Sequence, residues 1–324
     1  MTLTSMLRSP VLIAFAVLLF PGSSARATIG PSDTADIYAI AVDPTAPATL
    51  YAGTRNGGIY KTTDGGQSWT PASAGIIGSI YSNIALDPTD PEKLYLGTDG
   101  GGFFRTTDGG DHWIHGEGSY HQTVKSISID AVQANVITMG AFRDIYRSFD
   151  YGATWGILYQ FDFATGVLSI AQDPVSTNAM YIATNTHGLM KSIDGGYTWN
   201  RTAVSQISTV VAIDPGDHQV VLASGFNNLV KSTDSGATWR TTLDVPYGSA
   251  IAFDAANPGT VYASFDYNGV YVSNDGGETW SPANAGLPTL QIHALAIDSA
   301  NGILYAGTEA AGIFVSYDGG QTWM

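Results

Sequence analysis

The chain has 324 residues, no cysteine and a formal net charge of −15 at pH 7. A chain without cysteine has neither disulfides nor thiol catalysis. The excess of acidic residues argues against nucleic acid and anionic membrane surfaces as partners, because both repel a strongly negative protein.

Residues 1–27 have the features of a secretory signal peptide. Arg8 gives a positive start, residues 11–20 form an apolar run, and residues 25–27 (Ala-Arg-Ala) fit a cleavage site of small-x-small type. The apolar run is about half as long as a transmembrane helix needs to be. We therefore expect cleavage before Thr28, with an uncleaved membrane anchor as the alternative. The sequence predicts a secreted or periplasmic protein that has no membrane insertion after cleavage and whose single domain spans residues 28–324.

An eight-residue motif recurs seven times along residues 62–323 and contains every tryptophan of the chain. Its pattern is Ser/Thr-x-Asp-x-Gly-x-(Ser/Thr/His)-Trp, and successive motif aspartates are 40 to 44 residues apart. This period is typical of β-propellers, in which each repeat forms one blade of four strands. We therefore predict an all-β, seven-bladed β-propeller of four-stranded antiparallel blades, with one motif per blade. The motif aspartates are Asp64, Asp108, Asp150, Asp194, Asp234, Asp275 and Asp318.

The residue types of the motif fit a locked turn. An aspartate accepts hydrogen bonds from backbone N–H groups of its own turn, and a glycine two places on adopts a conformation that bulkier residues avoid. The tryptophan offers a large ring that can be buried between blades. We therefore expect the seven motif aspartates to be structural.

The first blade shows a strand pattern that recurs in the other six. Residues 37–43 alternate like a half-buried strand, and residues 49–54, 58–63 and 68–72 form the second, third and fourth strands. An aspartate ends the first strand of every blade, and we expect these residues to be structural too. They are Asp43, Asp87, Asp130, Asp173, Asp214, Asp254 and Asp298.

The seventh blade is shorter than the others. Only Trp323 and Met324 end its motif, where earlier blades continue for several more residues. Because an open sheet edge invites aggregation, we expect residues 28–35 to supply or cover the outer edge of this blade. A simply shorter blade is the alternative, since terminal segments are often disordered.

The motif is that of the Asp box, and the chain resembles the Asp-box (BNR-repeat) propellers. This group contains sialidases, xyloglucanases, sortilin-type receptors and photosystem II assembly factors. In the Asp-box enzymes the catalytic residues lie on the face opposite the boxes. The resemblance therefore implies a site at the mouth of the central channel, on the face away from the seven boxes.

The loops that join second to third strands line this mouth and break the repeat, as expected of binding residues on a rigid scaffold. The alternative for each residue is a solvated loop position or an aromatic ring that packs on its neighbour. The candidates from these loops are Arg55, Asn56, Asp99, Phe142, Arg143, Asn185, His187, Phe226, Asn227, Asp266, Tyr267 and Glu309. The outer connections add Tyr120, His121, Tyr159, Phe161, Phe163 and Tyr247.

The arginines do not support a sialidase. A sialidase needs three arginines to clamp the substrate carboxylate, and only Arg55 and Arg143 fall in channel-mouth loops. The Arg-Ile-Pro segment that precedes the first blade of sialidases is also missing.

A xyloglucanase resemblance is closer in the first blade, where residues 51–62 read YAGTRNGGIYKT. Arg55 stands where that family has a catalytic aspartate, and the family places its second carboxylate on another propeller. Asp99 and Glu309 flank this position from the neighbouring blades. Two carboxyl groups about 5 to 9 Å apart are what a glycosidase requires, so a glycoside hydrolase that uses Asp99 and Glu309 is the alternative function.

We predict an exported, non-enzymatic and monomeric binding or assembly propeller that recognises a carbohydrate, a protein or a peptide at the channel mouth. The resemblance to sortilin-type receptors and photosystem II assembly factors implies protein or peptide capture, although the cysteine-rich module of the former and the arginine-rich patch of the latter are not found. We expect no cofactor. We also expect no metal, because no segment has the alternating oxygen ligands of a D-x-D-x-D-G calcium loop.

Overall fold

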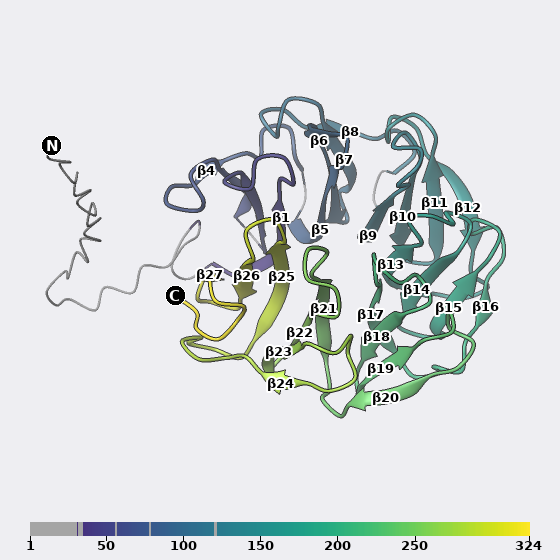
Figure 1. Cartoon of the computed structure of the whole chain (residues 1–324). Coiled ribbons are helices and arrows are strands. Elements are labelled where there is room, and N and C mark those ends of the chain that lie inside the picture. Colours follow the sequence, from purple (N-terminus) through teal and green to yellow (C-terminus); the bar gives the residue numbers. More distant parts are fainter. Residues whose placement is uncertain (1–30, 32–34, 56, 78, 120–121) are drawn as a thin grey trace, which may run out of the picture.

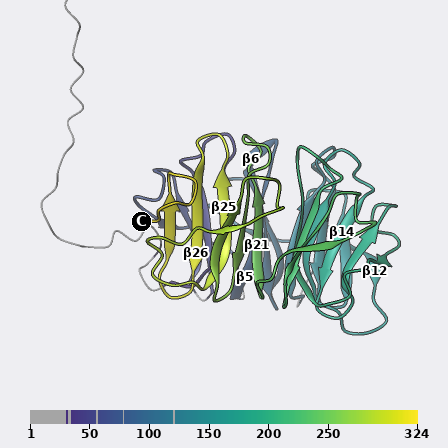
Figure 2. The ribbon, with the colours of Figure 1, turned by 60° about the horizontal axis from the view of Figure 1, so that its bottom comes forward.

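Seven antiparallel sheets are arranged in a ring around a central axis (Figure 1). The computed structural model describes residues 31, 35–55, 57–77, 79–119 and 122–324. Six sheets have four strands and the seventh has three, and the strands follow chain order within each sheet. Figure 2 shows the strands crossing the thickness of the ring. The predicted seven-bladed β-propeller is confirmed.

The first strand of every blade lies next to the channel. Each first strand contacts the first strands of the blades before and after it, and β1 contacts β25, so the ring is closed. The first strands are β1 (Ile37–Val42), β5 (Ser79–Asp87), β9 (Val124–Ile129), β13 (Val167–Gln172), β17 (Ser208–Ile213), β21 (Gly248–Phe253) and β25 (Ile292–Asp298).

The other strands follow outwards from the channel. The second strands are β2 (Leu50–Thr54), β6 (Asp90–Asp99), β10 (Ile137–Ala141), β14 (Met180–Thr184), β18 (Val221–Gly225), β22 (Val261–Phe265) and β26 (Ile303–Thr308). The third strands are β3 (Gly58–Thr62), β7 (Gly102–Thr106), β11 (Asp144–Ser148), β15 (Gly188–Ser192), β19 (Leu229–Ser232), β23 (Gly269–Ser273) and β27 (Ile313–Ser316). The fourth strands are β4 (Thr70–Pro71), β8 (Ile114–His115), β12 (Gly156–Gln160), β16 (Asn200–Arg201), β20 (Arg240–Leu243) and β24 (Ser281–Pro282).

The core lies between blades, where second strands are buried on both faces. Five of the seven second strands are buried along their whole length. Close packing also requires a small residue where the next blade approaches. A Cβ atom on Gly97 would lie 2.7 Å from Cγ1 of Val124, and one on Gly140 would lie 2.5 Å from Cγ1 of Val167. Contacts this short do not occur between real side chains, so larger residues there would push the blades apart.

The ends of the chain meet in the seventh blade. The Gly312 N–H donates to the Ala35 carbonyl at 3.2 Å, and the Ala310 N–H donates to the Asp36 carboxylate at 2.8 Å. Met324 exchanges two backbone hydrogen bonds with Val315 of β27, each 3.0 Å long, and so occupies the fourth-strand position. Ala35 therefore contacts the β26–β27 loop. The predicted role of residues 28–30 and 32–34 lies outside the described residues, as does the predicted signal peptide 1–27.

Each Asp box is built around a buried hydroxyl group. Ser192 is fully buried; its hydroxyl donates to the Asp194 carboxylate and accepts the Gly196 N–H, both at 2.8 Å. The Asp194 carboxylate then accepts the Thr198 N–H at 2.9 Å and the Thr198 hydroxyl at 2.6 Å. The serine or threonine that opens the box is buried in all seven blades. The predicted turn is present, and its buried centre is the hydroxyl rather than the carboxylate.

The boxes and the β1–β2 type loops share one face of the ring, which we call the box face. In blade one the Gly65 N–H of the box donates to the Ala48 carbonyl at 2.9 Å, and blade four repeats this bond between Gly195 and Asn178. The strand-ending aspartates accept backbone N–H groups of the same loops, as Asp43 does from Thr45 at 2.8 Å. Because strands of a meander alternate in direction, the β2–β3 type loops lie on the opposite, channel-mouth face.

A second set of contacts fastens some of the boxes to the blade before them. The hydroxyl of Tyr51 and the ammonium of Lys61 both donate to the Gly109 carbonyl in the next box, at 3.0 and 2.9 Å. Tyr51 and Lys61 are direct partners across β2 and β3. The same arrangement recurs with Tyr181, Lys191 and Ser235.

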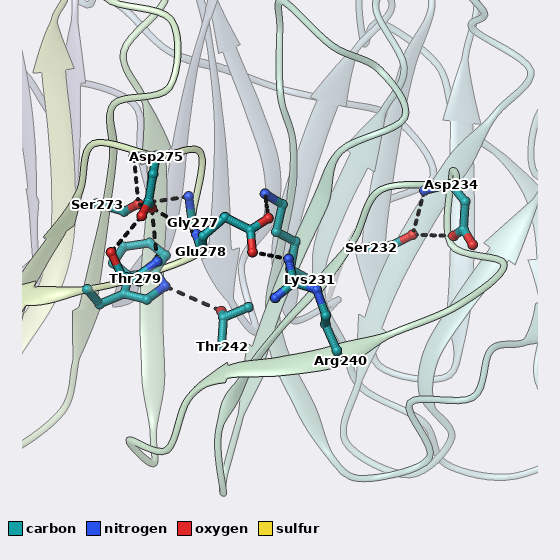
Figure 3. A network of polar contacts seen from close by, with 11 residues as sticks. Lys231, Ser232, Asp234, Arg240, Thr242, Ser273, Asp275, Gly277, Glu278 and Thr279 are labelled. Atoms are coloured by element: carbon teal, nitrogen blue, oxygen red, sulfur yellow. Dashed lines mark hydrogen bonds and ion pairs between the residues drawn. The ribbon is translucent and has the colours of Figure 1, made fainter.

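Between blades five and six, ion pairs take the place of these hydrogen bonds to a carbonyl (Figure 3). The buried Lys231 donates to the carboxylate of Glu278, inside the sixth box, at 2.6 Å, and Arg240 pairs with the second carboxylate oxygen. These hydrogen bonds, led by the one from Lys231, hold the pKa of Glu278 below its usual range. The blades are therefore joined by polar contacts on the box face as well as by apolar packing.

Replacing Ser192 by alanine should lower the free energy of unfolding by about 1–3 kcal/mol, because the Gly196 N–H loses its buried acceptor. Ser192→Thr is the matched control, since Thr62 and Thr106 fill the same position in blades one and two. Urea unfolding of both variants measures the difference. Equal stability of Ser192→Ala and the parent would show that the hydroxyl does not hold the turn.

Acid should destabilise the fold through the boxes. Hydrogen bonds from Thr198, and then from Ser192, lower the pKa of Asp194 to about 2, whereas an unfolded aspartate has a pKa of about 3.9. The unfolded chain therefore binds this proton first, and stability that is present above pH 4 is lost as the pH falls towards 2. Melting temperatures between pH 5 and pH 2 should fall less steeply for Asp194→Asn than for the parent, and parallel curves would contradict this assignment.

Candidate functional site

The central channel contains a cavity of about 380 Å³ that is lined by residues of all seven first strands. We call it the channel cavity. Asp266, from the β22–β23 loop, also lines it, so the cavity reaches the channel-mouth face. The polar side chains that line it include Tyr38, Asn83, Lys125, Thr209, Asp266 and His293.

One wall of the channel cavity is an aromatic and acidic cluster. The rings of Tyr38 and His293 are stacked, with centroids 4.3 Å apart and an interplanar angle of 12°. Nδ1 of His293 lies 3.0 Å from a carboxylate oxygen of Asp266, so Asp266 orients the imidazole. Nε2 of His293 is buried and has no partner within the described part of the chain. A polar ligand or a water molecule in the cavity would satisfy it.

Charged groups from three loops surround Tyr38. Burial raises the pKa of Tyr38; the Arg55 guanidinium opposes the rise, and the carboxylates of Glu309, Asp36 and Asp266 add to it. Arg55 also lies over the Tyr38 ring, 5.9 Å from its centroid. The junction of blades six, seven and one therefore brings three predicted candidates, Arg55, Asp266 and Glu309, around one phenol.

Sequence analysis missed the residues of the first strands that line the cavity, among them Tyr38, Asn83, Lys125 and His293. Tyr38, Lys125 and His293 share one repeat position, five residues before the strand-ending aspartate. The side chains at this position differ between blades while those around it alternate regularly. This variation at one repeat position is the feature of the sequence that could have identified these residues.

Three exposed aromatic residues lie together on the channel-mouth face, and we call them the aromatic triad. They are Phe226 in the β18–β19 loop, Tyr247 between β20 and β21, and Tyr267 in the β22–β23 loop. The ring centroids of Phe226 and Tyr247 are 5.5 Å apart, and those of Tyr247 and Tyr267 are 6.3 Å apart. The three residues are 44, 45 and 65% exposed. Their rings thus contact each other rather than a covering segment.

Backbone strain marks the same loops. Tyr247 has φ 62°, Tyr267 has φ 71° and Arg143 has φ 85°. Bulky residues seldom adopt the left-handed region, and positions that do so often belong to functional sites. All three are predicted candidates on the channel-mouth face.

A second aromatic group lies between blades three and four. His187 stacks on Phe163, with centroids 4.7 Å apart, and lies 5.5 Å from the centroid of the buried Phe161. Tyr159 contacts Phe161 edge-on at 5.1 Å. Nδ1 of His187 lies 3.2 Å from the Thr165 hydroxyl. Burial, followed by the charge of Arg201, lowers the pKa of His187, so its neutral form packs in this group.

The other predicted residues divide between exposed and structural positions. Phe142 is 54% exposed and forms a backbone bridge with Gly166. Asn185 accepts the Gly166 N–H at 2.7 Å, which fixes the loop rather than a ligand. Asn227 is exposed and donates to Gln206. Asn56, Tyr120 and His121 lie outside the described residues.

Among the described residues, no contact links the two carboxylates of the predicted pair, Asp99 and Glu309. Asp99 accepts the Thr123 hydroxyl at 2.5 Å, on the side of blade three. Glu309 lies on the side of blade seven, where its N–H donates to the Gln291 carbonyl at 3.0 Å and its charge acts on Tyr38. Asp36 and Asp266 are thus the carboxylates that share the surroundings of Tyr38 with Glu309.

Residues 31, 35–55, 57–77, 79–119 and 122–324 contain neither a metal-binding group of side chains nor a membrane-spanning helix. No three His, Asp or Glu side chains in these ranges are grouped so that they could hold a metal ion. None of the ranges contains a helix that is both long and apolar enough to span a bilayer.

Comparisons with known proteins agree with the repeat and the fold. The model of the BNR/Asp-box repeat family matches residues 271–282. No curated protein matches the chain in sequence.

Solved propellers are similar in structure. The GH74 xyloglucanase from Xanthomonas campestris superposes with a TM-score of 0.76 at 20% identity, over 91% of this chain and 55% of that one. YCF48 from Cyanidioschyzon merolae superposes with a TM-score of 0.63 at 15% identity, over 88% of this chain and 95% of that one. YCF48 bound to D1 peptide superposes with a TM-score of 0.66 at 17% identity, over 88% of this chain and 94% of that one.

The chain thus spans about half the length of the xyloglucanase and nearly the whole of YCF48. At these identities the likeness shows the fold alone. Seven box sequences, the match of residues 271–282 to the BNR/Asp-box repeat and the ring of seven sheets together show a seven-bladed β-propeller that carries Asp-box repeats.

Proposed function

We propose that the chain is an exported binding propeller, without catalytic activity, that holds a carbohydrate chain or a peptide across its channel mouth. The aromatic triad supplies the contact surface. The Tyr38–His293–Asp266 wall of the channel cavity supplies the hydrogen bonds that orient the ligand.

The exposure of the aromatic triad carries this proposal. Single exposed apolar residues are common, but clustered exposed aromatic rings are typical of binding surfaces. Aromatic side chains stack on the apolar faces of sugar rings and also anchor peptides. Two of the three residues hold a strained backbone conformation, which stability alone does not favour.

The polar wall and the aromatic triad share the β22–β23 loop. Asp266, which orients His293 in the channel cavity, directly precedes Tyr267 of the triad in the β22–β23 loop. A ligand that stacks on Tyr267 therefore has polar groups of the cavity next to it. An apolar platform beside a few fixed polar groups is the usual composition of a small-molecule or peptide site.

Similar propellers support both ligand classes. A GH74 xyloglucanase and a YCF48 bound to a D1 peptide share this fold. The net charge of −15 favours a neutral or cationic ligand over an anionic one at this face.

A glycoside hydrolase is the second candidate, and one observation favours it. Asp266 and Glu309, like Asp36, raise the pKa of Tyr38, so carboxylates lie near the channel mouth as a hydrolase would need. The pair that the sequence suggested, Asp99 and Glu309, has less support because Asp99 is engaged by Thr123.

Truncation of the aromatic triad tests the binding proposal. Tyr267→Ala and Phe226→Ala should each weaken binding of the ligand found on a glycan array or a peptide library by about tenfold or more, as expected of aromatic anchors. Tyr197→Ala is the matched control, because Tyr197 is 60% exposed but lies in a box on the opposite face. Equal losses in all three variants, or none, would refute the assignment of the site.

Reducing-sugar release from the same polysaccharides separates the two candidates. The proposal expects no release. Steady turnover that disappears in Asp266→Asn/Glu309→Gln, or in Asp99→Asn/Glu309→Gln, would establish a hydrolase and identify its carboxylate pair.

Export is the part of the proposal that the N-terminal sequence supports. Expression of the full chain in a bacterium with a Sec pathway should yield a periplasmic or secreted protein whose N-terminal residue is Thr28. Edman sequencing or intact-mass measurement checks this. Recovery of the chain with residues 1–27 intact in the membrane fraction would favour the anchor.

A further inference from the structure

A donor pair that recurs in blades one, two and four has different surroundings in blade two. In blade one, the pair Tyr51 and Lys61 donates to the Gly109 carbonyl of the following box. In blade four, the equivalent pair donates to the Ser235 carbonyl. Each pair consists of direct neighbours on the second and third strands, and each finds one shared acceptor.

Blade two has the equivalent pair, but its acceptor is missing. Tyr95 and Arg105 are direct neighbours across β6 and β7. Tyr95 is only 1% exposed, yet its hydroxyl has no hydrogen-bond partner, and the buried Nε of Arg105 has none either within the described residues. Burial, to which the Asp87 carboxylate adds, raises the pKa of Tyr95. The hydroxyl therefore stays protonated and remains a donor.

These two donors line a cavity of about 160 Å³ between blades two and three on the box face. Lys93 and Tyr151 line it as well, and Nζ of Lys93 lies over the Tyr151 ring, 4.8 Å from its centroid. Lys93 is paired with Asp90 at 3.1 Å. The cavity thus combines a paired lysine with an arginine Nε and a phenol that have no hydrogen-bond partner in the described part of the chain.

The third box differs in sequence from the second and the fifth at this junction. Tyr151 occupies the position of the first glycine of that box and has φ 57°. Its ring stands at Lys93, beside the cavity, where a glycine would have no side chain. Asp150 also lines the cavity, but Ser148 and Thr154 donate to both of its carboxylate oxygens at 2.7 and 2.6 Å.

We propose that this cavity is a binding site for a small oxyanion: a carboxylate, sulfate or phosphate group. Its unpartnered atoms are donors, and a donor without an acceptor is costly when buried. An arginine N–H group cannot coordinate a cation, and it presents itself to an oxyanion in matching geometry. A carboxylate, sulfate or phosphate oxygen would replace the carbonyl that Gly109 and Ser235 supply at the other junctions.

Thermal melting in sodium sulfate and in sodium phosphate, at constant ionic strength made up with sodium chloride, tests the site. A ligand that binds only the folded state raises the melting temperature in a saturable way. Sulfate or phosphate should do so for the parent. Arg105→Gln should weaken the binding by about tenfold or more, since a hydrogen bond to a charged group is lost.

Tyr95→Phe and Tyr51→Phe form a matched pair. Without sulfate or phosphate, Tyr95→Phe should not lower the melting temperature, because it removes a buried hydroxyl that has no partner among the described residues, whereas Tyr51→Phe should lower it. With sulfate, Tyr95→Phe should lose most of the shift and Tyr51→Phe should keep it. A shift in Arg105→Gln equal to that of the parent, no shift beyond chloride in the parent, or equal destabilisation by both Phe variants would each overturn the proposal.

Two further probes identify the source of the oxyanion. Glucuronate represents an acidic sugar, and an N-acetylated dipeptide represents a free peptide C-terminus. If one of the two probes raises the melting temperature in a saturable way, and Arg105→Gln abolishes this rise, that probe represents the class of ligand that the site binds. Stabilisation by sulfate or phosphate alone would assign a tetrahedral anion.

Discussion

The hydrogen bonds of the buried box hydroxyl are the interaction on which the rest of the structure depends. In Ser192 this one group joins the carboxylate of Asp194 to the N–H of Gly196. It thereby fixes the turn that leads from the third strand to the tryptophan of each box. Because the turn is fixed, its outer carbonyl stands where the preceding blade can donate to it, as Tyr51 and Lys61 do to Gly109. Where these contacts occur, the turn links one blade to the next in addition to the apolar packing between the blades.

Because the boxes stabilise one face of the ring, the sequence of the opposite, channel-mouth face can vary. The box face carries the repeated turns and the contacts between blades, whereas the channel-mouth loops carry few residues that repeat. There the strained Tyr247 and Tyr267 lie next to each other, and Asp266 orients His293 in the channel. A strained backbone lowers stability locally, and a rigid ring can tolerate it. The site face is therefore built on stability that the box face provides.

The fold could be predicted from the sequence because its determinants are local and repeated. The period of the boxes, the alternation of strands such as residues 37–43 and the strand-ending aspartates each act within one blade. The channel-mouth loops were predicted for the same reason. Tyr38 and His293 were missed because their importance comes from closure: blade one meets blade seven only in three dimensions, and each residue alone looks like part of an alternating strand. The hydroxyl of the box was undervalued because sequence does not show which polar group of a turn is buried.

Departure from a repeat is not by itself a sign of function, as two boxes demonstrate. Ser235 and Tyr151 both replace the first glycine, and both have positive φ. At Ser235 the carbonyl still accepts the donor pair of the preceding blade, so the substitution changes nothing between the blades. At Tyr151 a large ring lies over Lys93, and the equivalent donors, Tyr95 and Arg105, are left without an acceptor. A substitution in a box indicates a candidate site only if buried donors of the neighbouring blade lose their acceptor. That loss is seen only when the hydrogen bonds of successive blades are compared.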